Sequence, residues 1–67
     1  MKLWVARDEN GSLWLYNSEP KKEGYIYTNN GGVGDSLFLN QDILPEVTFE
    51  NSPQEVELKL VGNDTGR

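Results

Sequence analysis

The chain has neither cysteine nor histidine among its 67 residues. Without cysteine it can form no disulfide and no thiolate metal site. Without histidine it lacks the commonest metal ligand and the commonest general base at neutral pH. Carboxylates, lysines and hydroxyls remain, and no constellation of them is organised for catalysis. The sequence therefore predicts a non-enzymatic protein with no catalytic residue, no metal site and no cofactor.

Long apolar runs are also absent. No stretch approaches the ~20 residues that a membrane-spanning helix needs, and the N-terminus has no signal-peptide pattern. We therefore expect a cytoplasmic protein without a membrane partner. The length indicates one β domain over residues 1–61, and the wholly polar residues 62–67 are expected to be a disordered tail.

Basic residues are missing from a long part of the chain. Residues 23–58 hold seven acidic side chains and no lysine or arginine, and the whole chain has a net charge of −5. Binding to nucleic acid requires basic groups that replace the counterions of the phosphates. The charge pattern therefore disfavours a nucleic-acid partner, although aromatic side chains on strands could stack single-stranded bases.

The most informative stretch is residues 1–17, which is predicted to form a β-hairpin. Asp8 and Gly11 fit a three-residue loop in which a type I turn is followed by a bulge glycine with positive φ. This register places Asp8 opposite Ser12 and sorts the side chains by face. A two-residue Asn10-Gly11 turn is the competing arrangement, and it mixes aliphatic and aromatic side chains.

In the favoured register the hairpin is apolar on both faces. One face carries Leu3, Val5, Leu13 and Leu15, and the other, the aromatic face, carries Trp4, Ala6, Trp14 and Tyr16. Such a hairpin is either covered on both sides or exposes one face for a purpose. Either a second layer of the same fold covers the aromatic face, or this face docks a partner, because tryptophan and tyrosine are common anchors of binding hot spots.

Four more strands are expected after the hairpin, at residues 25–28, 37–39, 46–50 and 54–61. A charged loop at 18–24 and a glycine-rich connection at 29–36 separate the first of them from its neighbours. Asn40 is placed to cap one helical turn near 41–44, which Pro45 ends. Together these elements predict an all-β fold, a small antiparallel meander or partly closed barrel of five to six short strands.

The last expected strand has the clearest alternation in the chain. Val56, Leu58 and Leu60 alternate with charged residues, so one face is expected to be buried. The predicted core combines these three residues with Leu3 or Val5, Leu13 or Leu15, and Phe49.

The two ends of the chain carry four motifs: Trp4-Val-Ala-Arg-Asp8, Gly11-Ser-Leu13, Leu44-Pro-Glu-Val-Thr-Phe49 and Pro53-Gln-Glu-Val-Glu-Leu58. They resemble a group of small proteins of gut bacteria and their phages, with a Trp-x-Ala-Arg-Asp-x-x-Gly-x-Leu start, an aromatic residue or Leu before Pro-Glu-Val, and a Pro-x-Glu-Val-Glu ending. Residues 18–36 depart from the group. No activity is known for the group, so the resemblance implies no site. It implies a cytoplasmic accessory protein encoded by a phage or prophage.

These observations favour a protein-binding module that acts on a host protein. Its predicted binding residues are Trp4, Trp14, Tyr16, Tyr25 and Tyr27. The first alternative is a self-associating structural protein, a homodimer formed through the aromatic face of the hairpin. A second, less favoured alternative is a binder of single-stranded nucleic acid.

Overall fold

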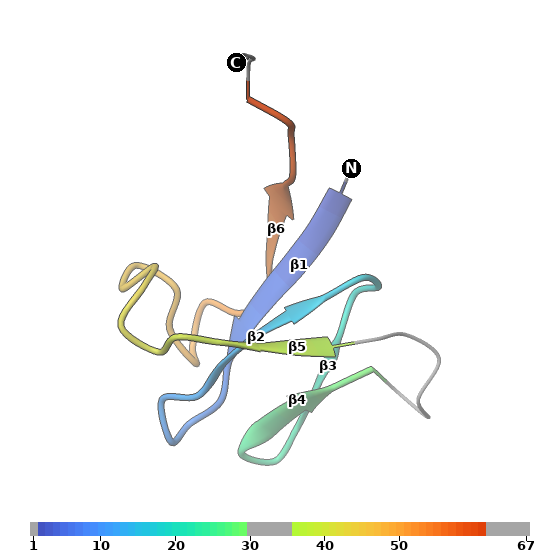
Figure 1. The fold of residues 1–67 in the computed structure, drawn as a ribbon. Helices are drawn as coiled ribbons and strands as arrows, with labels where there is room; N and C mark the ends of the chain where they lie inside the picture. Colours follow the sequence, from blue (N-terminus) through green and yellow to red (C-terminus); the bar gives the residue numbers. More distant parts are fainter. Residues whose placement is uncertain (1, 30–35, 62–67) are drawn as a thin grey trace.

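The computed structural model describes residues 2–29 and 36–61. Predictions for residues 30–35 and for the tail at 62–67 lie outside this part of the chain. The six strands are β1 (Lys2–Arg7), β2 (Leu13–Tyr16), β3 (Lys21–Glu23), β4 (Ile26–Thr28), β5 (Ser36–Leu39) and β6 (Gln54–Glu57). They form a four-stranded antiparallel sheet in the order β5-β2-β1-β6 and a two-stranded sheet of β3 and β4 (Figure 1). The predicted all-β class is confirmed, and the described strands form an open meander-like arrangement, not a closed barrel.

The first hairpin has the predicted register. Trp4 lies opposite Tyr16 and Ala6 opposite Trp14 across β1 and β2. The Asp8 N–H donates to the Ser12 carbonyl oxygen at 2.8 Å, and Gly11 has a φ of +98°. The three-residue loop with its bulge glycine is therefore confirmed, and the aliphatic and aromatic side chains lie on separate faces.

The expected loop at 18–24 is wrong in its second half, because Lys21–Glu23 forms β3. This strand pairs with β4 across a two-residue turn at Gly24 and Tyr25. Gly24 has a φ of +63°, as a type II′ turn requires at its first central position. All three side chains of β3 are exposed. A strand without an inward apolar residue has no alternation of apolar and polar side chains, so the sequence pattern did not predict β3.

Residues 46–50 form turns and not the expected strand. The Asn51 side-chain oxygen accepts from the Thr48 N–H at 2.7 Å, and the Asn51 amide donates to the Glu46 carbonyl at 2.8 Å. These local bonds satisfy backbone groups that a strand would pair with a neighbour.

The expected helical turn near 41–44 is a single hydrogen-bonded turn and not a helix. The Ile43 N–H donates to the Asn40 carbonyl at 3.2 Å, and the Asn40 side chain accepts from the Asp42 N–H at 2.8 Å. Leu44 then has a φ of +52°. This left-handed conformation ends the turn before Pro45, because it cannot continue a right-handed helix.

The core lies on both faces of the larger sheet. The aliphatic cluster consists of Val5, Leu13 and Val47, with Leu15, Leu39, Leu44 and Val56 packed against it. The aromatic cluster consists of Ala6, Tyr16 and Tyr27, with Trp4, Trp14 and Phe49 packed against it. The predicted core positions Leu3, Val5 and Leu13 are buried. Phe49 packs with the aromatic cluster and not with the aliphatic side chains.

The prediction for the last strand is wrong beyond Glu57. Val56 packs on the aliphatic cluster as expected, but Leu58 is 59% exposed and Leu60 is 103% exposed. The cause is the register of the neighbouring strand, in which Lys2 lies opposite Glu57. Residues 58–61 therefore extend past the described end of β1, and the apolar side chains of Leu58, Leu60 and Val61 are exposed.

Candidate protein-binding surface

The middle of the aromatic face is covered by the second sheet. Tyr27 of β4 packs against Tyr16 of β2, and both side chains are buried, at 5% and 4% exposure. Asp8, in the loop of the first hairpin, positions this layer by accepting from the Tyr27 N–H at 2.9 Å. The Glu9 N–H adds a bond to the Tyr25 carbonyl at 3.0 Å. The second layer is thus tied to the hairpin by its loop as well as by its side chains.

The two buried tyrosines have the polar partners that buried phenols need. The Tyr16 hydroxyl donates to the Tyr27 carbonyl at 3.1 Å. The Tyr27 hydroxyl lies 2.9 Å from the carbonyl oxygens of both Phe49 and Ser52. Burial, and secondarily the negative charge of Asp8, raise the pKa of Tyr16 to about 12. These features are those of core residues, and neither side chain is accessible to a partner.

The flank of the aromatic cluster is closed by a lysine from β3. Lys22 lies opposite Tyr27 in the register of β3 and β4. Its ammonium nitrogen is 4.3 Å from the ring centroid of Phe49 and 5.8 Å from that of Tyr27. This is cation–π geometry. The charged strand therefore has a packing role that its composition does not reveal.

Trp14 is the predicted residue that remains at the surface with an aromatic neighbour. It is half-buried on the aromatic cluster, and across β2 and β5 it lies opposite Phe38. The two rings meet edge to face, with centroids 5.1 Å apart and an interplanar angle of 66°. Phe38 itself is 56% exposed. The Trp14–Phe38 pair is therefore a partly exposed aromatic surface with a rigid base.

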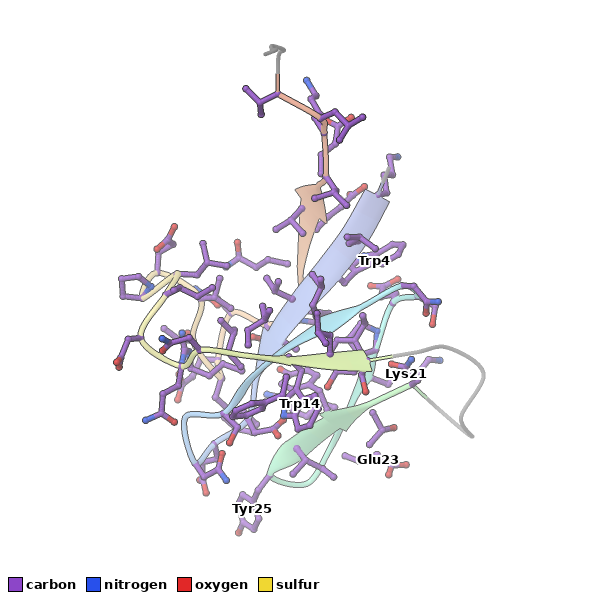
Figure 2. All side chains as sticks on the ribbon, in the orientation of Figure 1. Trp4, Trp14, Lys21, Glu23 and Tyr25 are labelled. Atoms are coloured by element: carbon purple, nitrogen blue, oxygen red, sulfur yellow. The ribbon has the colours of Figure 1, made fainter. Side chains whose placement is uncertain are left out.

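The other predicted binding residues are distributed differently. Trp4 is half-buried and packs on the aromatic cluster with Trp14, Tyr16 and Tyr27. Tyr25 lies in the turn between β3 and β4 and is 71% exposed, far from Trp4 in the view of Figure 2. The structure thus brings four of the five predicted residues into one cluster and leaves Tyr25 outside it. It adds Phe38, whose position opposite Trp14 depended on a pairing that the sequence did not specify.

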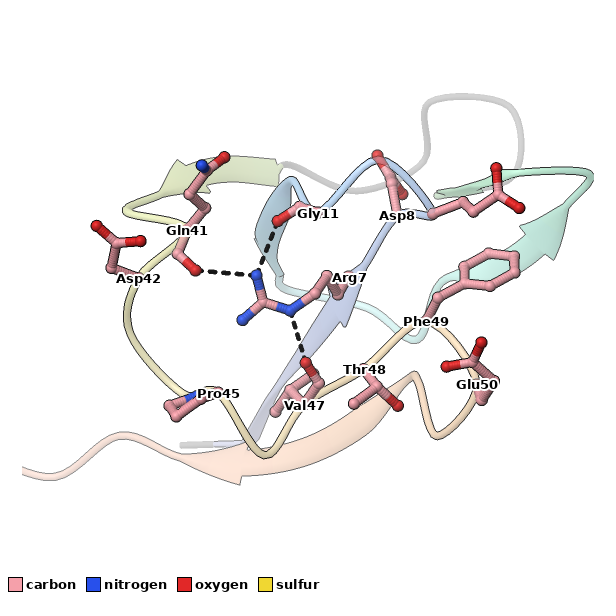
Figure 3. Close-up of a pocket in the computed structure, with 11 residues that line it drawn as sticks. Arg7, Asp8, Gly11, Gln41, Asp42, Pro45, Val47, Thr48, Phe49 and Glu50 are labelled. Atoms are coloured by element: carbon pink, nitrogen blue, oxygen red, sulfur yellow. Dashed lines mark hydrogen bonds between the residues drawn. The ribbon is translucent and has the colours of Figure 1, made fainter.

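A hollow of about 460 Å³ lies between the hairpin loop and the 41–50 segment (Figure 3). Arg7 is at its centre. The guanidinium donates at 2.6 to 3.1 Å to five backbone carbonyl oxygens, those of Gly11, Gln41, Ile43, Leu44 and Val47. A guanidinium has five N–H donors in all. Arg7 therefore has no donor left for an anionic ligand, and its role is structural.

The rim of this hollow is acidic, with Asp8, Glu9, Asp42 and Glu50. Asp8 is engaged by the Tyr27 N–H. Within residues 2–29 and 36–61, no three acidic side chains gather closely enough to hold a metal ion. The same part of the chain contains no helix that is long and apolar enough to cross a membrane.

The exposed aromatic pair is thus the best-formed candidate surface in the described part of the chain. Comparison with protein-family models, with curated proteins and with solved structures returns no match.

Proposed function

We propose that this chain is a small, non-enzymatic module that binds a partner protein through the Trp14–Phe38 pair. The observation that carries the proposal is the edge-to-face contact of these two rings on a face where Phe38 stays 56% exposed. Large aromatic side chains that folding leaves at the surface next to one another are typical of binding hot spots. The contact with Trp14 also holds Phe38 in place, so that little side-chain freedom is lost on binding.

The packing beneath the pair supports the same proposal. Trp14 rests on the aromatic cluster, whose central residues Tyr16 and Tyr27 are almost fully buried. A rigid aromatic platform with one exposed side is well suited to fill, or to receive, an apolar side chain of a partner. The net charge of −5 would favour encounter with a basic partner.

The narrower parts of this proposal rest on the sequence alone. They are a cytoplasmic location, an origin in a phage or prophage, and an accessory or inhibitory action on a host protein. The alternative of a homodimer through the hairpin's aromatic face loses support, because Tyr16 at the centre of that face is covered by Tyr27. A nucleic-acid partner is also less favoured, since Lys22 is engaged with the rings of Phe49 and Tyr27.

The test separates binding from stability at Trp14. The tagged protein would capture its partner from a bacterial extract, and the affinity of the purified pair would then be measured for the wild type and for Trp14→Ala. We expect binding to fall at least about tenfold. The melting temperature should fall less than for a fully buried tryptophan, whose truncation costs about 3–5 kcal/mol. A collapse of stability without a separate loss of affinity would assign Trp14 to the core and overturn the proposal.

A further inference from the structure

The segment that follows β6 carries exposed apolar side chains away from the body of the protein. In Figure 1 residues 58–61 project past the two sheets, beyond the end of β6. Leu60 is 103% exposed, Val61 94% and Leu58 59%. Water-exposed apolar side chains in a row are uncommon on a protein that stays monomeric, and they mark a surface that another chain covers.

The strand that leads into this segment lies at the edge of the sheet. β6 is the last strand of the order β5-β2-β1-β6, so among the described strands only β1 pairs with it. An open strand edge is a template for pairing with another strand. Residues 55–61 therefore combine an edge with an apolar extension, and both can be covered at once by one added strand.

The sequence of this segment is complementary to itself in one antiparallel register. If Leu58 of one copy lies opposite Leu58 of a second copy, Val56 lies opposite Leu60 of that copy. In the same register Glu57 lies opposite Lys59 of the second copy. Val56, Leu58 and Leu60 then each face an apolar residue, Val61 lies opposite Glu55, and the two-fold symmetry forms the Glu57–Lys59 pair twice. Such cross-strand pairs are the unit of sheet stabilisation.

The neighbouring registers are less stable because they place like charges, or charged and apolar side chains, opposite one another. A pairing centred on Glu57 sets two glutamates directly opposite one another, and one centred on Lys59 does the same with two lysines. Like charges in directly opposed positions are destabilising. A shift by a single residue between these registers places charged side chains opposite apolar ones at most positions, including Leu58 and Leu60 in both cases. Charge and alternation therefore select one register.

The ion pairs within a single copy do not compete with the Glu57–Lys59 pairs of this register. Lys2 forms an exposed ion pair with Glu55 at 3.5 Å. Within the described part of the chain neither Glu57 nor Lys59 has an ion-pair partner. In the paired register Glu57 would lie between Lys2 of its own β1, which it already faces, and Lys59 of the second copy.

The apolar side of the pairing continues an existing core. Val56 lies opposite Leu3 in the register of β1 and β6 and packs on the aliphatic cluster. Leu60 of the second copy would follow Val56 in the same row, across the new strand edge. The pairing would thus extend the aliphatic cluster of each copy with a leucine that is fully exposed in the monomer.

We propose that residues 55–61 pair antiparallel with the same residues of a second copy, with Leu58 on the two-fold axis. This joins the two four-stranded sheets into one. The dimer uses the β6 edge, whereas the Trp14–Phe38 pair lies on β2 and β5, so the proposal is independent of the proposed function.

The test measures the mass in solution by sedimentation equilibrium over a range of concentrations. The wild type should approach twice the mass of the chain. Lys59→Glu and Glu57→Lys each create two like-charge pairs and should each raise the dissociation constant about tenfold. An equimolar mixture of these two variants restores both opposite-charge pairs, and it should form the mixed dimer with near wild-type affinity.

A second pair of variants tests the apolar side of the register. Leu60→Ser should weaken the dimer without lowering the melting temperature at dilutions where the protein is monomeric, because the Leu60 side chain is 103% exposed within one copy. Leu37→Ser, at the exposed opposite edge of the sheet, should leave the dimer intact. A wild type that stays monomeric throughout would overturn the proposal. So would a dimer that persists in Leu60→Ser, or a mixture of charge variants that does not pair.

Discussion

Arg7 Nε lies 2.6 Å from the carbonyl oxygen of Val47, forty residues further along the chain. Val47 is 3% exposed and closes the aliphatic cluster over Val5 and Leu13. The end of β1 thus holds the long segment between β5 and β6 against the sheet. That segment forms no strand, so the guanidinium takes the place of the backbone ladder that would otherwise anchor it.

Replacement of Arg7 by lysine should destabilise the protein although it keeps the charge. A lysine has one ammonium group and cannot reach carbonyls on both sides of a planar fork. We expect a loss of about 2–4 kcal/mol in the free energy of unfolding, since several carbonyls lose a charged donor. Urea unfolding of Arg7→Lys and of Lys2→Met, which removes only the exposed pair with Glu55, measures the difference. Equal, small losses in the two variants would contradict a structural role for Arg7.

Gly11 should be replaceable only by residues that tolerate positive φ. A Cβ added at this position meets nothing within 4 Å, so the constraint is the φ of +98° and not space. Gly11→Val should cost more than ~1 kcal/mol, because a β-branched residue is strongly disfavoured there. Gly11→Asn should cost less. Chemical denaturation of the two variants checks this order, and equal stabilities would remove the conformational argument.

Truncation of a leucine to alanine should destabilise the protein in the core but not in the extension after β6. Leu13 is fully buried, so Leu13→Ala should destabilise by about 2–5 kcal/mol. Leu60→Ala should change the stability of the monomer by less than about 0.5 kcal/mol, because the side chain is exposed. Thermal melts at low protein concentration compare them. A large loss for Leu60→Ala would show that the segment packs on its own domain.

Stability should fall at alkaline pH through Tyr16. Its pKa is raised from 10.0 to about 12 in the folded protein, so the folded state holds the phenolic proton more tightly than the unfolded state. The contribution is fully present below pH 10 and is lost as the pH rises from 10 to 12. The melting temperature of Tyr16→Phe should therefore decline less over this interval than that of the wild type. Parallel declines would exclude Tyr16 as the cause.

The parts of the fold that depend on local pattern were predictable. The separation of aliphatic from aromatic residues fixed the register of the first hairpin, and Asp8 and Gly11 fixed its loop. The same pattern predicted that Val5 and Leu13 are core residues. It also left open whether the aromatic face is covered. In the structure this face is partly covered: Tyr16 is covered by Tyr27, whereas Trp14 is partly exposed.

The parts that depend on distant partners were not predictable. β3 has no apolar side chain, and it is defined by its pairing with β4 and by the position of Lys22 over the Phe49 ring. The alternation from Val56 to Leu60 is that of a buried strand, yet the described part of the sheet ends beside Glu57. Phe38 became part of the candidate surface only because β5 pairs with β2. No local signal marks Arg7 as the anchor of a segment that lies forty residues away.

The most direct measurement compares two adjacent residues of β5 that are similarly exposed but lie on opposite faces of the sheet. Leu37 and Phe38 are exposed to nearly the same extent, 59% and 56%, but Phe38 lies against Trp14 and Leu37 points to the opposite face. Affinity for the captured partner would be measured for Phe38→Ser and Leu37→Ser, with melting curves for both. Binding through the Trp14–Phe38 pair predicts that Phe38→Ser loses at least about tenfold in affinity while Leu37→Ser binds as the wild type does. Equal affinities in the two variants would contradict it.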